Sequence, residues 1–410
     1  MLGHTNQFLL GASYDHGRVG YASSSDLGTF GSDFTLSPID PTFLILQPDD
    51  FNPRNLTTQN DYVGIYFSDT IDLTPALAFT VGGRFNYARL AIQDNTGLDP
   101  EVNGAHVYER FNPMTGFTYQ FHDGLTLYGS YAEANRAPTP AELSCSDPNN
   151  PCLIESFLTS DPNLHQVVSR TFELGLRGKE AYGHGGKLEW SAGLFHAMNF
   201  NDILALAAPE TGRGYFQNVG DTLRQGVELG LRYTDPRLMV YANYAFVAAT
   251  IETDVQLPSP NNPNGVPCDN APDATCSNAS AGDRLPGIPE HRFKAGFDYW
   301  VTHEWKFGGD LLVASNQIFY GDWANNNAPL AGYATVNLHS SYDVNEHFQL
   351  YGLINNLFDS HYGLFGTFFD TETANGAAAA AGLGDSFFTN PRTITPAQPL
   401  AAYAGARIKF

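Results

Sequence analysis

Apolar and polar residues alternate with a period of two along most of this chain of 410 residues. The stretch from Gln217 to Tyr233 shows the pattern clearly: after Gly220, apolar residues come to occupy every second position, namely Val227, Leu229, Leu231 and Tyr233. A period of two predicts a β-strand, because successive side chains of a strand point to opposite faces. The positions between them carry glycine and opposite charges rather than a lysine-rich solvated surface. We therefore expect the apolar face to meet lipid and the polar face to line a lumen.

The connections between the expected strands alternate between short turns and long loops. We expect about fifteen strands of roughly 9 to 12 residues. The first two, at 5–14 and 18–27, are expected to be joined by the tight turn Asp15-His16-Gly17. Long loops are expected at residues 28–60, 91–105, 135–165, 202–216, 250–288, 320–330 and 359–399.

Strict alternation of turn and loop places all turns on one side of a membrane and all long loops on the other. This asymmetry is typical of outer-membrane barrels, whereas a propeller shows a repeat of its own length and a sandwich has loops of mixed size. We therefore predict an all-β chain that folds as a transmembrane antiparallel β-barrel.

The expected number of strands and the first residues both indicate whether this chain forms a complete barrel. An antiparallel bacterial barrel closes with an even number of strands, so an odd count predicts that part of the barrel is missing. The opening MLGHTNQFLLGASYD has no basic segment, apolar core or small-residue cleavage site, so it is not a signal peptide. We expect a truncated chain. No boundary between domains is visible, and residues 1–410 are expected to form one unit.

Composition and motifs argue against several other classes of protein. No run approaches the roughly 18 apolar residues of a membrane-spanning helix. The formal net charge of −22 argues against nucleic-acid binding, which requires a basic face. The histidines are scattered, and the sequence has no HExxH motif, serine nucleophile elbow or phosphate-binding loop. We expect no enzyme activity, no cofactor and no metal site.

The cysteines form two close pairs, Cys145 with Cys152 and Cys268 with Cys276. Each pair lies among Asp, Asn, Pro and Ser residues, a composition that predicts a loop. A zinc site would need a CxxC motif or nearby histidines, and neither pair has them. We therefore predict two local disulfides in an oxidising compartment. With the C-terminus on the periplasmic side, both cysteine loops are extracellular.

Several segments resemble, in the right order, blocks of one family. They are Asp61–Asp69 with Val81–Phe85, Phe111-Asn112-Pro113, Asn135–Thr139, Thr171–Arg177, Asn218-Val219-Gly220, Leu285–Pro289, Asn355–Asp359 and the terminal Phe410. In series they resemble the C-terminal barrel portion of a TonB-dependent outer-membrane receptor of the siderophore-receptor type. The resemblance implies that about 15 of 22 strands are present, and that the N-terminal plug domain and the TonB-binding segment are absent.

The resemblance also implies a function: active uptake of a scarce nutrient, first of all a ferric siderophore, across the bacterial outer membrane. The alternatives are a cobalamin, haem or oligosaccharide receptor, a passive porin, and a structural or adhesive surface barrel. The implied partners are a small-molecule ligand, the TonB system through the missing N-terminal region, the outer membrane with its lipopolysaccharide, and the barrel assembly machinery through Phe410. We expect a monomer.

Ligand binding is expected on the extracellular loops, because binding residues concentrate on loops carried by a rigid scaffold. The candidates are Phe157, His165, Tyr215, Phe216 and Gln217. The alternative is that these loops only cover the barrel mouth and contact lipopolysaccharide. Charged residues on the polar strand faces are expected to pair across the lumen wall. They are Arg84, Glu173, Arg177, Glu228, Arg232, Arg292 and Lys294.

Overall fold

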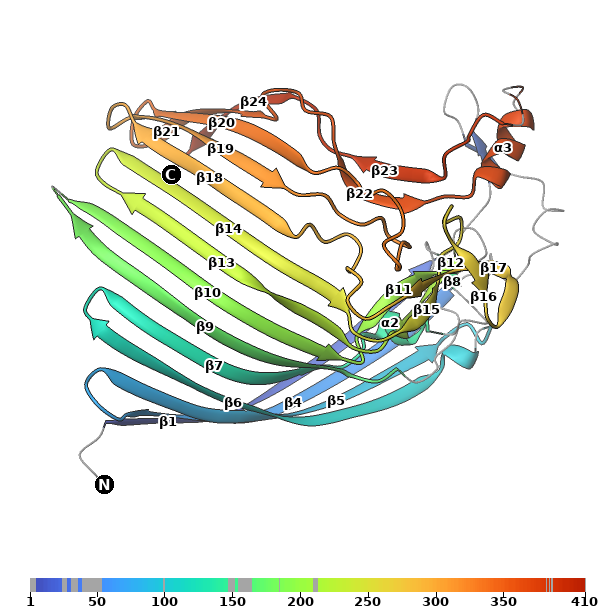
Figure 1. Ribbon diagram of the computed structural model, residues 1–410, viewed down its shortest axis with the longest axis horizontal. Helices are drawn as coiled ribbons and strands as arrows, with labels where there is room; N and C mark the ends of the chain where they lie inside the picture. Colours follow the sequence, from blue (N-terminus) through green and yellow to red (C-terminus); the bar gives the residue numbers. More distant parts are fainter. Residues whose placement is uncertain are drawn as a thin grey trace.

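The computed structural model describes residues 5–23, 28–30, 36–38, 54–98, 100–146, 152–153, 164–183, 185–208, 213–380, 382, 384 and 386–409. Its main feature is an antiparallel sheet of 14 strands, in which each strand pairs with the next main strand along the chain (Figure 1). These strands are β1 (Asn6–Ser23), β4 (Arg54–Asp72), β5 (Leu77–Asp94), β6 (Gly104–His122), β7 (Leu125–Arg136), β9 (Val167–Tyr182), β10 (Gly186–Phe200), β13 (Thr222–Thr234), β14 (Leu238–Ile251), β18 (His291–Trp300), β19 (Trp305–Ala314), β20 (Tyr333–Asp343), β21 (Phe348–Asn355) and β24 (Ala401–Ile408).

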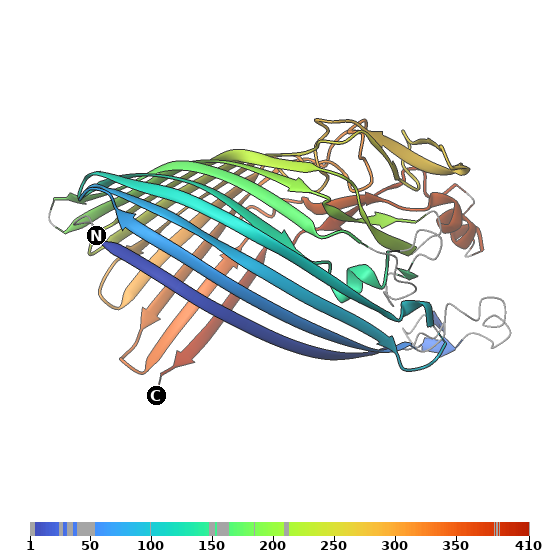
Figure 2. The ribbon, with the colours of Figure 1, turned by 90° about the horizontal axis from the view of Figure 1, so that it is seen from below.

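The sheet curves into a trough, with β1 and β24 at its two edges (Figure 2). Short hairpin turns gather at one end, and the long connections, with the small sheets and helices, lie at the other (Figure 1). We call these the turn end and the loop end. The predicted asymmetry is confirmed, as is the all-β antiparallel class. In the part of the chain that is described, β1 and β24 each pair on one side only, so closure into a barrel stays a prediction.

The predicted turn at Asp15-His16-Gly17 is wrong. These residues lie inside β1 and pair with residues 60–62 of β4. The strand continues through this turn-like composition because Asp61 of β4 holds two of its side chains: His16 Nδ1 lies 2.8 Å from the Asp61 carboxylate, and the Tyr14 hydroxyl donates to it at 2.9 Å. The two expected strands are therefore one, the sheet has 14 strands rather than about fifteen, and the argument from an odd count no longer holds.

Smaller sheets and short helices make up the loop end. One sheet has the order β11 (Ile203–Ala207), β12 (Arg213–Asn218), β8 (Cys152–Leu153), and another the order β15 (Val255–Pro258), β17 (Ala271–Ala279), β16 (Val266–Cys268). Two more are β2 (Gly28–Phe30) with β3 (Leu36–Pro38), and β22 (Gly363–Phe368) with β23 (Arg392–Pro396). The helices are η2 (Pro100–Val102), α2 (Pro140–Leu143) and α3 (Thr371–Ala380).

The predicted disulfide between Cys268 and Cys276 is present, and it joins β16 to β17. Cys145 is also disulfide-bonded. The side chain of its predicted partner, Cys152, lies outside the described part of the structure, so that pairing stays a prediction.

Two hydrophobic clusters lie beneath the loops. The first, which we call the Trp323 cluster, contains Leu206, Ala208, Tyr215, Val219, Ala249, Ile251, Leu257, Ala279, Leu285 and Trp323. The second, the Leu90 cluster, contains Leu56, Leu90, Ile92, Val102, Leu143, Leu164, Val167 and Ile203. Leu90 and Ile92 come from β5 and Leu143 from α2, which lies inside the trough (Figure 2). The loop elements therefore pack against the inner face of the sheet.

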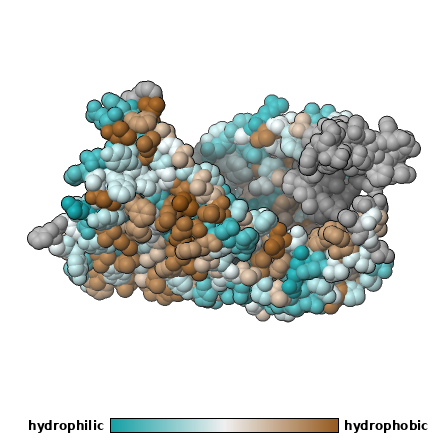
Figure 3. Space-filling model, turned by 90° about the horizontal axis from the view of Figure 1, so that it is seen from above, coloured by the Kyte–Doolittle hydropathy of each residue, from teal (hydrophilic) through white to brown (hydrophobic). Residues whose placement is uncertain are grey.

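The opposite, outer face is apolar. Leu194 of β10 has Leu174 and Val227 as its register partners on the neighbouring strands, and it is 55% exposed. Figure 3 shows hydrophobic residues gathered over the strand part of one side of the molecule, with hydrophilic residues more frequent toward the loop end. Exposing such side chains to water costs about 1 to 2 kcal/mol each, and hydrocarbon removes that cost. Among the described residues, none of the helices has both the length and the apolar character needed to cross a membrane.

Candidate functional site

Two of the predicted ligand residues are core residues of the loop end. Tyr215 is 7% exposed and belongs to the Trp323 cluster, and burial raises the pKa of its phenol. Phe216, the next residue of β12, packs against the Leu90 cluster, and its N–H donates to the carbonyl oxygen of Cys145 at 2.6 Å. Because adjacent side chains of a strand point in opposite directions, β12 joins the two clusters.

The other predicted ligand residues are more accessible or lie outside the description. His165 is exposed, and its N–H donates to Asn218 Oδ1 at 2.9 Å. Gln217 is half-buried on β12, opposite Leu204. Phe157 lies outside the described residues. The structure thus brings His165 next to β12, and the ligand-binding role of all five residues stays a prediction.

The second cysteine loop and the loop before β20 are tied together around Asp322. This residue is 1% exposed, and its carboxylate accepts the backbone N–H groups of Asn326 and Asn327, each at 3.0 Å. Asn327 Nδ2 in turn donates to Asn262 Oδ1 at 2.9 Å. The adjacent Trp323 donates its Nε1–H to the carbonyl oxygen of Pro258 at 3.0 Å. Buried hydrogen bonds of this kind fix the two loops relative to each other.

The lumen wall contains a seam between β6 and β7, toward the loop end. Backbone pairing of these strands ends at Met114 and Ala132, although β6 continues to Gly104 and β7 continues to Arg136. Pro113, the residue next to the last pair, has no N–H to donate to a ladder. Side chains cross this seam in place of backbone hydrogen bonds.

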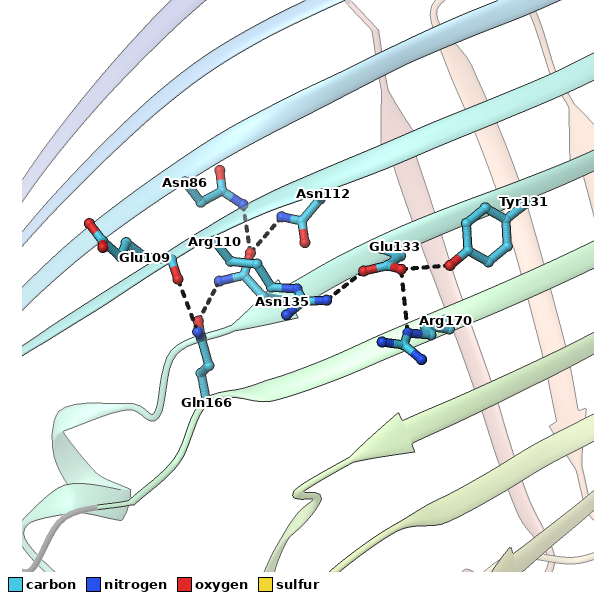
Figure 4. Close-up of polar contacts among 9 residues, drawn as sticks. All are labelled: Asn86, Glu109, Arg110, Asn112, Tyr131, Glu133, Asn135, Gln166 and Arg170. Carbon is cyan, nitrogen blue, oxygen red and sulfur yellow. Dashed lines mark hydrogen bonds and ion pairs between the residues drawn. The ribbon is translucent and has the colours of Figure 1, made fainter.

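A carboxylate with several partners closes part of the seam (Figure 4). Glu133 Oε2 lies 2.5 Å from Arg110, and Glu133 Oε1 lies 3.3 Å from Arg170. The Tyr131 hydroxyl also donates to Glu133 Oε1 at 2.6 Å. The Glu133 side chain is only 12% exposed, so this pairing compensates the cost of burying its charge. Both carboxylate oxygens are occupied.

A chain of side-chain amides crosses the same seam, and its direction is fixed (Figure 4). It starts at the carbonyl oxygen of Glu109, which can only accept, so Gln166 Nε2 donates to it at 3.1 Å. Gln166 Oε1 then accepts from Asn135 Nδ2 at 2.8 Å. Asn135 Oδ1 accepts from two donors, Asn112 Nδ2 at 2.6 Å and Asn86 Nδ2 at 2.9 Å. The orientation of every amide follows from the first.

One branch of this amide chain ends at Arg84, which is held in place on the inner face. Arg84 Nε donates to Asn86 Oδ1 at 2.6 Å, and Nη2 donates to Ser13 Oγ at 2.8 Å. The guanidinium lies 5.3 Å from the centre of the Tyr66 ring. It also lies across Gly64, where a Cβ atom would come within 1.9 Å of Nη2. Among the described residues no carboxylate pairs with Arg84.

A cavity of about 390 Å³ lies beside the amide chain. Its lining includes Arg84, Asn86, Asn112, Glu133 and Asn135. Sequence reasoning missed the amides of this site, because single Asn and Gln residues on a strand face belong to no motif. The available signals were Asn112 and Asn135, which lie in the family blocks Phe111-Asn112-Pro113 and Asn135–Thr139.

The prediction of which charged residues form ion pairs on the lumen wall is wrong. Within the described structure, no ion pair joins any two of the seven charged residues expected to pair. Wall pairs exist between other residues: besides Glu133, Asp298 lies 2.7 Å from His339 and 3.3 Å from Lys306. The prediction failed because pairing depends on strand register, which sets neighbours across the sheet. The described residues also contain no group of three or more His, Cys, Asp or Glu side chains that could hold a metal ion.

Comparison with known proteins identifies the family. A family model described as "TonB dependent receptor-like, beta-barrel" matches residues 2–357. The metal-pseudopaline receptor CntO of Pseudomonas aeruginosa is 26% identical over 308 residues, which cover 74% of this chain and 37% of that receptor. The siderophore receptor PiuA from Acinetobacter baumannii has a similar structure, with a TM-score of 0.65 at 16% identity, covering 100% of this chain and 54% of that one.

A further similar structure is the ferric yersiniabactin uptake receptor FyuA from Yersinia pestis, with a TM-score of 0.63 at 15% identity, covering 99% of this chain and 51% of that one. This chain therefore spans about half the length of these structures and 37% of CntO. At such identities the structural likeness shows the fold alone. The family is made up of transport receptors rather than enzymes. Because its model matches most of the chain, the chain belongs to the TonB-dependent receptor family, whose β-barrel lies in the bacterial outer membrane.

Proposed function

We propose that this chain forms the wall and the extracellular mouth of a receptor that takes up a scarce nutrient across the outer membrane. A ferric siderophore is the first candidate cargo. The family match over residues 2–357 carries this proposal. The relative named for a metal complex and the structural neighbours named for siderophores support a metal chelate as the cargo. Energy for the movement comes from the inner membrane through the TonB system. The protein itself does no covalent chemistry.

We also propose that a plug domain and further strands complete the receptor. Both edges of the described sheet, at β1 and β24, are unpaired on one side. In hydrocarbon, each unsatisfied backbone group costs several kcal/mol, so a spanning sheet is stable only when its edges are joined. A plug would add part of the binding surface. The isolated chain of 410 residues is then expected to bind ligand weakly and to transport nothing.

We further propose the outer membrane, its lipopolysaccharide and the barrel assembly machinery as partners. The apolar outer face fits the outer membrane, and the hydrophilic loop end fits contact with lipopolysaccharide. Phe410, through which the barrel assembly machinery would recognise the chain, lies outside the described residues. A monomer suffices for this function, since one complete barrel encloses its own lumen.

Growth under iron limitation tests the cargo. A strain that lacks the gene for the complete receptor is supplied with single ferric chelates, and the same strain carrying the gene on a plasmid is the control. We expect loss of growth on one ferric siderophore and normal growth on an excess of simple iron salt. Equal growth of both strains on every ferric chelate, together with a defect on cobalamin, haem or an oligosaccharide, would replace the siderophore as cargo.

A further inference from the structure

One end of the amide chain in the seam, the side-chain oxygen of Asn112, has no hydrogen-bond partner among the described residues. Asn112 is 6% exposed, and among the described residues its Oδ1 accepts no hydrogen bond. Turning the amide around does not help, because Asn135 Oδ1 needs the Asn112 Nδ2 donor and the orientation of Asn135 is fixed through Gln166. Buried carbonyl oxygens are nearly always satisfied, so an acceptor left open beside a cavity indicates that a donor from outside the chain occupies it.

Arg84 provides the second half of the site. It is the direct register partner of Asn112 on the neighbouring strand, so the two Cβ atoms lie about 4.5 to 5.5 Å apart, and both residues line the cavity. Of the five N–H groups that a guanidinium carries, one is used by Asn86 and one by Ser13. The others are free to bind an anion in a planar, bidentate way.

The nearby acid does not neutralise Arg84. Glu133 also lines the cavity, but its oxygens are occupied by Arg110, Arg170 and Tyr131. The charged residues that line the cavity are thus Arg84 and Glu133, and Glu133 is already paired with Arg110 and Arg170, which leaves the Arg84 charge uncompensated among the described residues. An anion gains most where a cation is fixed in position before binding.

We propose that this cavity binds a hydroxycarboxylate group. The carboxylate accepts hydrogen bonds from the free N–H groups of Arg84, and the hydroxyl donates to Asn112 Oδ1. A plain carboxylate would leave Asn112 without a donor, and a water molecule alone would leave the Arg84 charge without a counter-ion. A side chain of the proposed plug domain is the competing occupant, and it would prevent either acid in the test below from binding. This binding site stands whether or not the protein imports a ferric siderophore, since it concerns recognition at the wall rather than transport.

Malate and succinate are suitable probes, because they differ by a single hydroxyl group. Binding of each radiolabelled acid to the complete protein, purified in detergent, is measured by equilibrium dialysis. We expect malate to bind about tenfold more tightly than succinate, since a polar site discriminates against a ligand that leaves its acceptor unpaired. Arg84→Gln is expected to weaken both ligands by about tenfold or more. In Asn112→Ala, the affinity for malate should fall to the affinity for succinate.

Arg177→Gln is the matched control. Arg177 is another inner-face arginine without an ion-pair partner among the described residues, and it lies 5.9 Å from the ring centre of Tyr128, outside this cavity. Its removal should change neither affinity by more than about twofold. Arg84→Lys keeps the charge, so it should weaken both acids less than Arg84→Gln and retain the preference for malate.

The variants must first be shown to fold, by circular dichroism and by their heat-modifiable mobility in gels. If Asn112→Ala does not fold, the Arg84 variants and the comparison of the two acids in the unchanged protein decide the question. Three results would each overturn the proposal. The first is equal affinity of the unchanged protein for malate and succinate, and the second is no binding of either acid at about 10 mM. The third is an equal loss of affinity in Arg84→Gln and Arg177→Gln.

Discussion

Glycine at single positions decides where neighbouring strands and side chains can approach each other. At Gly64, the missing Cβ leaves room for the Arg84 guanidinium to lie flat on the wall. At Gly226, a Cβ would lie 1.8 Å from the carbonyl oxygen of Phe246 on β14. A backbone oxygen cannot move aside without disturbing the ladder between β13 and β14. At Gly352 the nearest atom is the carbonyl oxygen of Tyr403 at 3.5 Å, an ordinary contact.

We therefore predict that Gly226→Ala lowers the free energy of unfolding by about 1 to 3 kcal/mol, the usual cost of forcing an extra carbon into a packed site. The matched control, Gly352→Ala on β21, should change it by less than about 0.5 kcal/mol. Urea unfolding of the protein in detergent micelles, followed by tryptophan fluorescence, measures both. Equal effects of the two substitutions would show that the close approach at Gly226 is not real.

Among the structural elements, the small strand β12 has a larger role than its length suggests. Its residues Tyr215 and Phe216 enter different hydrophobic clusters, and these clusters contain residues from the first cysteine loop, the second cysteine loop and the segment before β20. The loop end is thus a packed unit on top of the sheet rather than a set of independent loops. Loops held in this way form a fixed surface.

Tyr215→Ala should open this unit. Removing a buried aromatic side chain costs about 3 to 5 kcal/mol, and the loss falls on the loop end because the main sheet does not depend on Tyr215. We expect faster cleavage by proteinase K within residues 201–221, identified by mass spectrometry, while the strands of the main sheet stay protected. His165→Ala is the control, since His165 is exposed. Cleavage rates that match those of the unchanged protein would argue against a packed loop end.

The main strands could be predicted from the sequence because lipid on one side and a lumen on the other impose a strict period of two. The same reasoning failed at Asp15-His16-Gly17, where pairing with β4 outweighs local turn composition. It named Tyr215 and Phe216 as ligand candidates, which stays a prediction, but it did not foresee that both pack into the core of the loop end. The amide chain at Asn86, Asn112 and Asn135 depends on register and on the end of pairing at Met114, neither of which a single sequence reveals.

The whole molecule is a curved wall with different solvents on its two faces and different connections at its two ends (Figures 1 and 2). Exposed leucines on the outer face require lipid, whereas the inner face carries arginines, carboxylates and amides that require water or a ligand. The loop end carries its own core, so these loops have a stable support.

Dependence on TonB tests the central claim of active uptake most directly. The measurement is the initial rate of radioactive iron uptake from the active ferric chelate, in cells that carry the complete receptor, with and without the TonB gene. We predict saturable uptake that falls to the level of receptor-free cells when TonB is removed, while binding of the chelate to the cell surface persists. Uptake that continues without TonB and rises in proportion to the chelate concentration would contradict active transport and identify a passive pore.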